Sequence, residues 1–177
     1  MQQVINFYST RDVPYGVLGN FPLFELLIDD KTWKSSEVYF QAKKFENTEH
    51  EELVRNAPSS REAANMGRDR SRPLRADWNS VKDIAGLSDH ASLSLLWAKY
   101  VGRPMLVKDY FMLVAVRAKF TQHPQLHDLL LSTADAILVE HTENDNYWGD
   151  GGDGSGQNML GKILMLVREE LRTAQAQ

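Results

Sequence analysis

The sequence predicts an α+β fold, formed by a single helix-rich domain with a small β-sheet. Several long stretches carry apolar residues at helical spacing, whereas only a few short segments have the pattern of strands. The 177 residues are enough to bury one substantial core. No Pro- or Ser-rich linker divides the chain. We therefore expect one domain over residues 1–177.

Strands are expected near the start of the chain. "VINFY" looks extended, and "FPLFELLIDDKTW" has the pattern of two short strands joined around Asp29 and Asp30, so a small sheet should open the chain. A helix is predicted over 35–57, because serines precede Glu37 and helix formers follow it. The remaining predicted elements are helices at 59–68, 93–101, 107–120, 124–134 and 158–174, and a buried strand at 136–141.

Composition indicates an ordinary globular protein with an uneven charge distribution. The net charge is -4, arginines gather between 61 and 75, and residues 140–153 are acidic. This distribution could seat one phosphate, but stable nucleic-acid binding is not expected. The lack of cysteine excludes disulfides, cysteine zinc sites and thiol nucleophiles. No signal peptide or membrane span is visible, so the expected location is cytoplasmic.

One face of the helix that follows Ser35 could carry chemistry. Glu37, Gln41 and Lys44 stand at i, i+4 and i+7, with aromatic residues around them. This stripe could be a solvated helix face. Alternatively, an acid and an amine line a pocket, where a desolvated lysine can attack a carbonyl-like carbon and a carboxylate can transfer protons.

Arginines recur in "GRDRSRPLRADW", at positions 68, 70, 72 and 75. A guanidinium group matches phosphate oxygens well, so one or two of these residues could bind a phosphate. The alternative is a loop of salt bridges facing solvent. The sequence alone leaves both interpretations open.

The glycine-rich stretch "WGDGGDGSGQNMLGK" allows several interpretations. Gly156, Gly161 and Lys162 match GxxxxGK, but Ile163 stands where a phosphate loop needs Ser or Thr to bind magnesium. The aspartates do not follow calcium-loop spacing. Either the stretch is a turn before the last helix, or Trp148 presents a ring to a flat ligand. His123 and His127 form HxxxH, but the intervening Pro124 indicates a helix start rather than a metal site.

Six segments together resemble one family. They match from about residue 5 to 171, in the right order: "INFYS", "GNF", "TWKSSEVYFQAKKF", "MGRDRSRPLRADW", "RAKF" and "LVEHTENDNYWGDGGDGSGQNMLGKILM". The chain resembles the NADAR superfamily, and within it the YbiA-type riboflavin biosynthesis intermediates N-glycosidases.

The resemblance implies hydrolysis of the N-glycosidic bond in phosphoribosylamino-pyrimidine intermediates of riboflavin synthesis. Ribose 5-phosphate would be released through a lysine Schiff base at C1', without a metal or cofactor. A related activity removes ADP-ribose from guanine bases. A weakened protein that only binds ADP-ribose or a nucleotide is a third possibility. The implied partner is a small phosphoribosyl or ADP-ribosyl molecule, and oligomeric state is not addressed.

Carried onto this chain, the resemblance implies that Lys44 is the nucleophile and that Glu37 transfers protons or stabilises positive charge on the ribose. Trp148 would flank the base, glycines would let backbone approach it, and the arginines would hold the phosphate. The expected substrate-binding residues are Asn20, Phe21, Gln41, Arg68, Arg70, Arg72, Asp145, Trp148, Gly149, Asp150 and Asn158.

The chain departs from the family pattern at three places. Gly19 stands where relatives usually have Ser, and Val38 where they usually have His. The third departure is length. The tripeptide "VKD" occurs at 81–83 and again at 107–109, and residues 84–109 look inserted between the two family segments. The amphipathic part of this stretch could form an extra surface helix, a lid or a partner contact.

Overall fold

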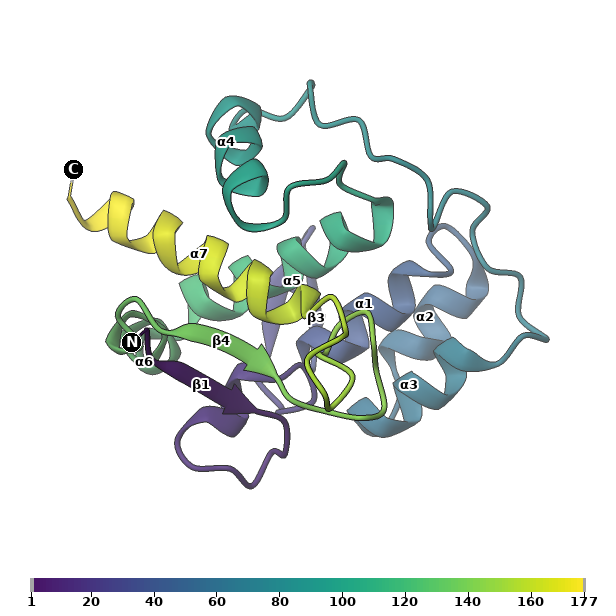
Figure 1. Cartoon of the computed structure of the whole chain (residues 1–177). Helices are drawn as coiled ribbons and strands as arrows, with labels where there is room; N and C mark the ends of the chain where they lie inside the picture. The colour runs from purple at the N-terminus through teal and green to yellow at the C-terminus, as the bar shows by residue number, and fades with distance from the viewer. Residues whose placement is uncertain (1, 177) are drawn as a thin grey trace.

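A computed structural model describes residues 2–176, and Figure 1 shows the arrangement of its elements. In chain order, the elements are β1 (Val4–Phe7), η1 (Tyr15–Leu18), β2 (Leu26–Ile28), β3 (Lys31–Trp33), α1 (Ser36–Lys43), α2 (Glu49–Arg55), α3 (Ser60–Arg68), α4 (His90–Tyr100), α5 (Val107–Gln122), α6 (Pro124–Ser132), β4 (Ile137–Glu140) and α7 (Met159–Gln175). Helices dominate and the strands are short, so the predicted α+β class is confirmed.

The strand pairing differs from the sheet expected at the start of the chain. Only β2 and β3 form a local antiparallel hairpin, whose turn places Asp29 and Asp30 at positive φ (52° and 58°). β1 instead pairs in parallel with the distant β4, with Phe7 opposite Glu140. A parallel partner needs a crossover connection, so sequence proximity could not identify it.

The predicted helix at 35–57 is two helices. α1 ends at Lys43 and α2 begins at Glu49, and Asn47 between them has a φ of 65°. Asparagine tolerates this left-handed conformation, and its backbone N–H donates to Glu51 Oε2 at 3.0 Å. The break places Lys44 just beyond the end of α1.

The core lies between the β1–β4 sheet and the helices. α7 packs against both α5 and β4, and α1 packs against α5 and α3. α1 is buried along its length because its aromatic side chains enter the core, and Tyr39 meets Trp33 edge to face at 5.0 Å. α1 is therefore held rigidly.

The stretch proposed as an insertion forms a long excursion from the core. Figure 1 shows α4 above α7, joined to the blue helices by an extended connection. Leu93 and Trp97 are the buried residues of α4 itself. The two ends of the excursion meet, because the Val107 N–H donates to the Ser80 carbonyl at 3.0 Å. The insertion of residues 84–109 stays a prediction. Within residues 2–176, no helix is both long and apolar enough to cross a membrane.

Candidate active site

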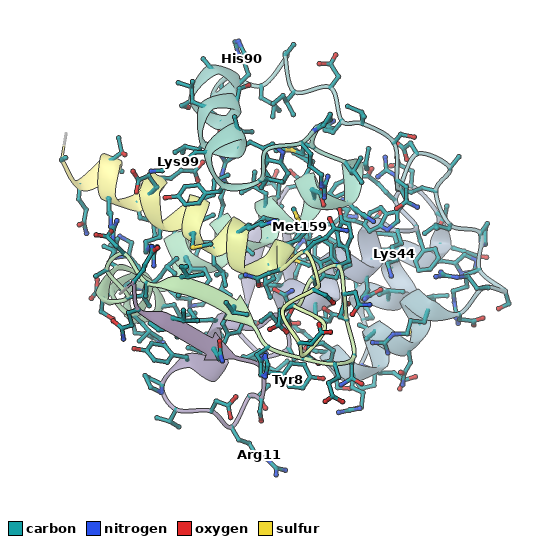
Figure 2. The ribbon with its side chains drawn as sticks, viewed as in Figure 1. Tyr8, Arg11, Lys44, His90, Lys99 and Met159 are labelled. Atoms are coloured by element: carbon teal, nitrogen blue, oxygen red, sulfur yellow. The ribbon has the colours of Figure 1, made fainter. Side chains whose placement is uncertain are left out.

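A cavity of about 240 Å³ opens between α1 and the loop that follows β4. Its walls are Tyr8, Asn20, Phe21, Glu37, Phe40, Gln41, Lys44, Arg68, Met112, Glu140, Thr142, Asn144, Asp145 and Trp148. Figure 2 labels Lys44 beside the blue helices and Tyr8 just after β1. A wider hollow between α2 and α3 has carboxylates and apolar residues but no nucleophile in its walls. The smaller cavity is therefore the candidate site.

The start of α1 is fixed to two other segments. Ser35 Oγ caps the helix by accepting the Val38 N–H at 3.2 Å, and it lies 2.8 Å from Ser60 Oγ on α3. The Glu37 N–H donates to the Asn20 carbonyl at 3.1 Å. These contacts place Glu37 in the first turn of α1, beside the Asn20–Phe21 wall.

Glu37 and Lys44 lie in the same desolvated environment. Burial raises the pKa of Glu37, opposed by a 2.7 Å hydrogen bond from Gln41 Nε2 and by the charge of Lys44. Burial also lowers the pKa of Lys44 to about 8, although the charge of Glu37 opposes this shift. At pH 7 roughly a tenth of Lys44 would be the neutral amine, against under about a thousandth for an ordinary lysine.

The neighbouring Lys43 has a different environment. Its ammonium lies 3.0 Å from both Glu46 Oε1 and Glu51 Oε1 and close to the Trp33 ring. Burial disfavours the charged form, but these two carboxylates prevail and raise the pKa of Lys43. Within the described chain, Lys44 Nζ makes only one hydrogen bond, a 3.3 Å contact to the Gly67 carbonyl. Of this lysine pair, Lys44 is the one suited to nucleophilic attack.

Gly67 on α3 is required for the packing of Gln41. A Cβ at this position would lie 1.8 Å from Gln41 Oε1 and 2.7 Å from its Cδ. Gln41 would have to move, and its hydrogen bond to Glu37 would be lost. The Gly67 carbonyl also accepts the hydrogen bond from Lys44, so Gly67 contacts two of the three polar residues on this helix face.

We expect Gly67→Ala to lower kcat several-fold, because Gln41 can no longer hold Glu37. The cost of overpacking should be about 1–3 kcal/mol of stability, so the variant should still fold. Gly86→Ala is the matched control, since an added Cβ there meets nothing within 4 Å. Steady-state kinetics should show no further loss when Gln41→Ala is added to Gly67→Ala. Wild-type kcat in Gly67→Ala would contradict this coupling.

Asp145 and Trp148 enter the cavity from the loop over 141–158. Asp145 Oδ1 accepts the backbone N–H groups of Tyr147 and Trp148 at 2.8 and 2.7 Å. The Trp148 ring meets Phe40 edge to face at 5.1 Å. A half-buried indole therefore forms one wall, with a carboxylate beside it, as a site for a polar heterocycle requires.

Three of the expected binding residues support this loop and do not line the cavity. Asp150 accepts the Thr142 and Gly152 N–H groups at 3.1 and 2.9 Å and contacts His141 Nδ1 at 2.8 Å. Asn158 Oδ1 accepts the Glu140 N–H at 3.0 Å. A Cβ on Gly149 would lie 2.9 Å from the Glu140 carbonyl, so only glycine allows this close approach.

The arginines have separate environments. Arg68 lines the cavity, and the charge of Arg70 is near enough to lower the pKa of Lys44. Arg72 pairs with Asp69, and Arg75 pairs with Glu46 and Asp77. Lys108, at the start of α5, also lowers the pKa of Lys44. The cations available beside the cavity are thus Arg68, Arg70 and Lys108.

Sequence reasoning did not select several residues of the cavity wall. The ones it missed are Tyr8, Phe40, Met112, Glu140, Thr142 and Asn144. Glu140, Thr142 and Asn144 belong to the "LVEHTENDNYWGD" segment, which was their available signal. Val38 is fully buried and does not line the cavity. A Cβ on Gly19 would sit 3.4 Å from the nearest atom, so neither departure alters the wall directly.

Comparison with known proteins identifies the family of this chain. The NADAR domain family matches residues 105–172. N-glycosidase YbiA of Escherichia coli is 48% identical over 168 residues, covering 95% of this chain and 88% of that protein. The chain belongs to the NADAR family of YbiA-type N-glycosidases. An N-glycosidase of Nostoc punctiforme is 36% identical, and the match covers 95% of this chain and 92% of that protein.

The NMR structure of E. coli YbiA has the same fold. It superposes with a TM-score of 0.79 at 46% identity, covering 100% of this chain and 90% of that one. A riboflavin biosynthesis protein of Vibrio vulnificus is 36% identical, but the chain covers only 40% of its length. The expected family, fold and enzyme class are therefore confirmed: this NADAR protein is a hydrolase of the N-glycosidase type.

Proposed function

We propose that this NADAR protein hydrolyses the N-glycosidic bond of phosphoribosylamino-pyrimidines, the early intermediates of riboflavin biosynthesis, and releases ribose 5-phosphate. One observation carries the proposal. The cavity holds a desolvated lysine amine next to carboxylates, with an indole among its walls. This set can attack a sugar carbon, transfer protons and contact a flat base.

Lys44 is the proposed nucleophile. Its neutral amine attacks C1' of the ribose, and the resulting Schiff base is hydrolysed by water, which frees the amine and the sugar phosphate. Desolvation supports this role because it lowers the pKa of Lys44 to about 8. Glu37, seven residues earlier on the same face, takes up protons and stabilises positive charge on the ribose.

The substrate is held by groups around this pair. Trp148 flanks the pyrimidine ring, and Asp145 and Asn20 lie where they can bond its polar edge or the ribose hydroxyls. Arg68, with Arg70 and Lys108 nearby, receives the 5-phosphate. Phosphate bound there would lie close to Lys44.

Cavity size favours the smaller of the two substrate classes. Binding sites for drug-sized ligands usually span about 300–1,000 Å³, and this cavity is about 240 Å³. A phosphoribosylamino-pyrimidine fits that scale better than ADP-ribosylated guanine, which carries a second phosphate, a second ribose and an adenine. Release of ADP-ribose from guanine is therefore the activity measured for comparison.

The experiment offers both substrates to the purified protein. We expect release of ribose 5-phosphate from phosphoribosylamino-pyrimidines, measured by chromatography, at a kcat/KM well above that for release of ADP-ribose from modified guanine. Faster release of ADP-ribose would reverse the assignment. Binding of either compound without turnover would show a protein that only recognises these ligands.

A further inference from the structure

Glu140, the last residue of β4, has its side chain on the core face of the strand. Register pairs Ile5 with Leu138 and Phe7 with Glu140, and side chains on paired residues of a parallel sheet point to the same face. Ile5, Phe7 and Leu138 are all buried core residues. Glu140 continues their row at the strand end, where the core gives way to the cavity.

No hydrogen bond or ion pair within residues 2–176 engages the Glu140 carboxyl group. Only its backbone is used: the N–H donates to Asn158 Oδ1 at 3.0 Å, and the carbonyl accepts the Asp150 N–H at 3.0 Å. The strand end is thus fixed while the acid remains free in the cavity wall. Glu140 is partly buried, lines the cavity and has no partner for its carboxyl group among residues 2–176, so it is placed to contact a bound ligand.

The charged groups that shift the pKa of Glu140 are carboxylates. Burial raises its pKa to about 8, assisted by the charges of Asp145, Glu37 and Asp150. Glu37 faces it from α1 and Tyr8 from the end of β1, while His141, Asp145 and Asp150 belong to the loop that follows. Lys44 and Arg68 are the cationic residues of the same wall. Glu140 therefore carries a proton at neutral pH.

We propose that Glu140 is the acid that protonates the leaving nitrogen, an assignment that rests on the proposed N-glycosidase activity. The Nζ–C1' bond to Lys44 forms and the C1'–N bond to the base breaks. The electron pair of the broken bond stays on the base nitrogen, which takes the proton from Glu140. The C1'–O4' bond then breaks as a proton passes from Nζ to O4', which gives the Schiff base, and the Glu140 carboxylate accepts a proton from the water that attacks C1'. Finally the Nζ–C1' bond breaks as the new hydroxyl proton passes to Nζ. This step leaves the C1' aldehyde of ribose 5-phosphate and restores both the acid and the free lysine.

This role differs from that of Glu37, whose carboxylate is engaged by Gln41 and lies beside Lys44. Burial raises the pKa of both acids, but at Glu37 the hydrogen bond from Gln41 and the charge of Lys44 oppose that shift, whereas at Glu140 neighbouring carboxylates add to it. Glu37 acts beside the Lys44 amine, and Glu140 protonates the leaving nitrogen.

The test compares Glu140→Gln on two substrates with different leaving groups. The first is a phosphoribosylamino-pyrimidine, and the second is 4-nitrophenyl riboside 5-phosphate, whose nitrophenolate departs without protonation. We expect kcat to fall about 100- to 10,000-fold on the first substrate, the usual range for loss of a general acid. On the second, we expect the pre-steady-state burst of nitrophenolate, which reports cleavage of the bond to the leaving group alone, to slow only a few-fold. Glu143→Gln, in the same loop but outside the cavity wall, is the control.

The pH profile gives a second readout. Wild-type kcat/KM should decline above about pH 8 as Glu140 loses its proton, and Glu140→Gln should lack this alkaline limb. Glu140→Asp should retain the limb with a reduced rate. Equal losses on both substrates, or an unchanged alkaline limb in Glu140→Gln, would overturn the assignment. A wild-type protein inactive on both substrates would instead overturn the proposed function itself.

Discussion

Lys44→Ala is expected to abolish turnover while leaving the domain folded. Removing a covalent nucleophile typically costs on the order of a thousandfold or more in kcat, because no other group can form the intermediate. The amine makes one long hydrogen bond to Gly67, so few native contacts are lost. Product release under single-turnover conditions measures the loss, and far-UV circular dichroism checks the fold.

Borohydride reduction tests the identity of the nucleophile. A trapped sugar adduct should appear on Lys44 in the wild type and should be missing in Lys44→Ala. Lys162→Ala is the matched control, because that lysine lies on α7 outside the cavity wall. Trapping on Lys43 or any other lysine would contradict the assignment.

Stability should respond to this substitution in a pH-dependent way. The lowered pKa of Lys44 means that folding disfavours its charged form, so this penalty is fully present below about pH 8. The penalty is relieved as pH rises from about 8 toward the ordinary lysine value near 10.5. Any gain in Tm of Lys44→Ala over the wild type should therefore be largest near neutral pH, consistent with a site that trades stability for reactivity.

Trp148→Ala should weaken kcat/KM by about 5- to 150-fold, since stacking of an aromatic ring on a base contributes roughly 1–3 kcal/mol. The loss should come from the missing ring surface, because the loop backbone is held independently by Asp145 and Asp150. Steady-state kinetics measure the effect. Trp148→Phe, which keeps an aromatic face beside Phe40, should recover most of it.

The same experiment distinguishes a phosphate loop from a base-binding wall in the glycine-rich stretch. A phosphate loop would depend on Lys162 and magnesium rather than on an indole. Wild-type kinetics in Trp148→Ala, combined with magnesium-dependent activity that disappears in Lys162→Ala, would reject Trp148 as a wall of the base site.

The sequence by itself determined those features that depend on local spacing. Helical periodicity placed Glu37, Gln41 and Lys44 on one face, and the structure brings these side chains into one cavity. Apolar spacing likewise predicted helices at α5, α6 and α7. The motif order identified the NADAR family, which the similarity to E. coli YbiA confirms.

The predicted helix runs through the break because helix formers lie on both sides of Asn47, where the chain turns at positive φ and the Asn47 N–H donates to Glu51. Local pattern also could not predict the different environments of Lys43 and Lys44. Both are lysines of one motif, but carboxylates from α2 and the α1–α2 turn pair with the first, whereas the second enters a cavity. Burial and pairing are properties of the assembled fold.

The tertiary structure alone decided which charged side chains are available for a ligand. The sequence pattern did not distinguish Arg68 from Arg72 and Arg75. In the structure Arg72 forms an ion pair with Asp69, and Arg75 forms one with Glu46. Glu140 could be recognised only after β1 had paired with β4, because that register turns its carboxyl toward the core face. Spacing determines which side of an element a residue occupies, whereas the packing of distant elements determines whether that side meets water, an ion partner or an empty cavity.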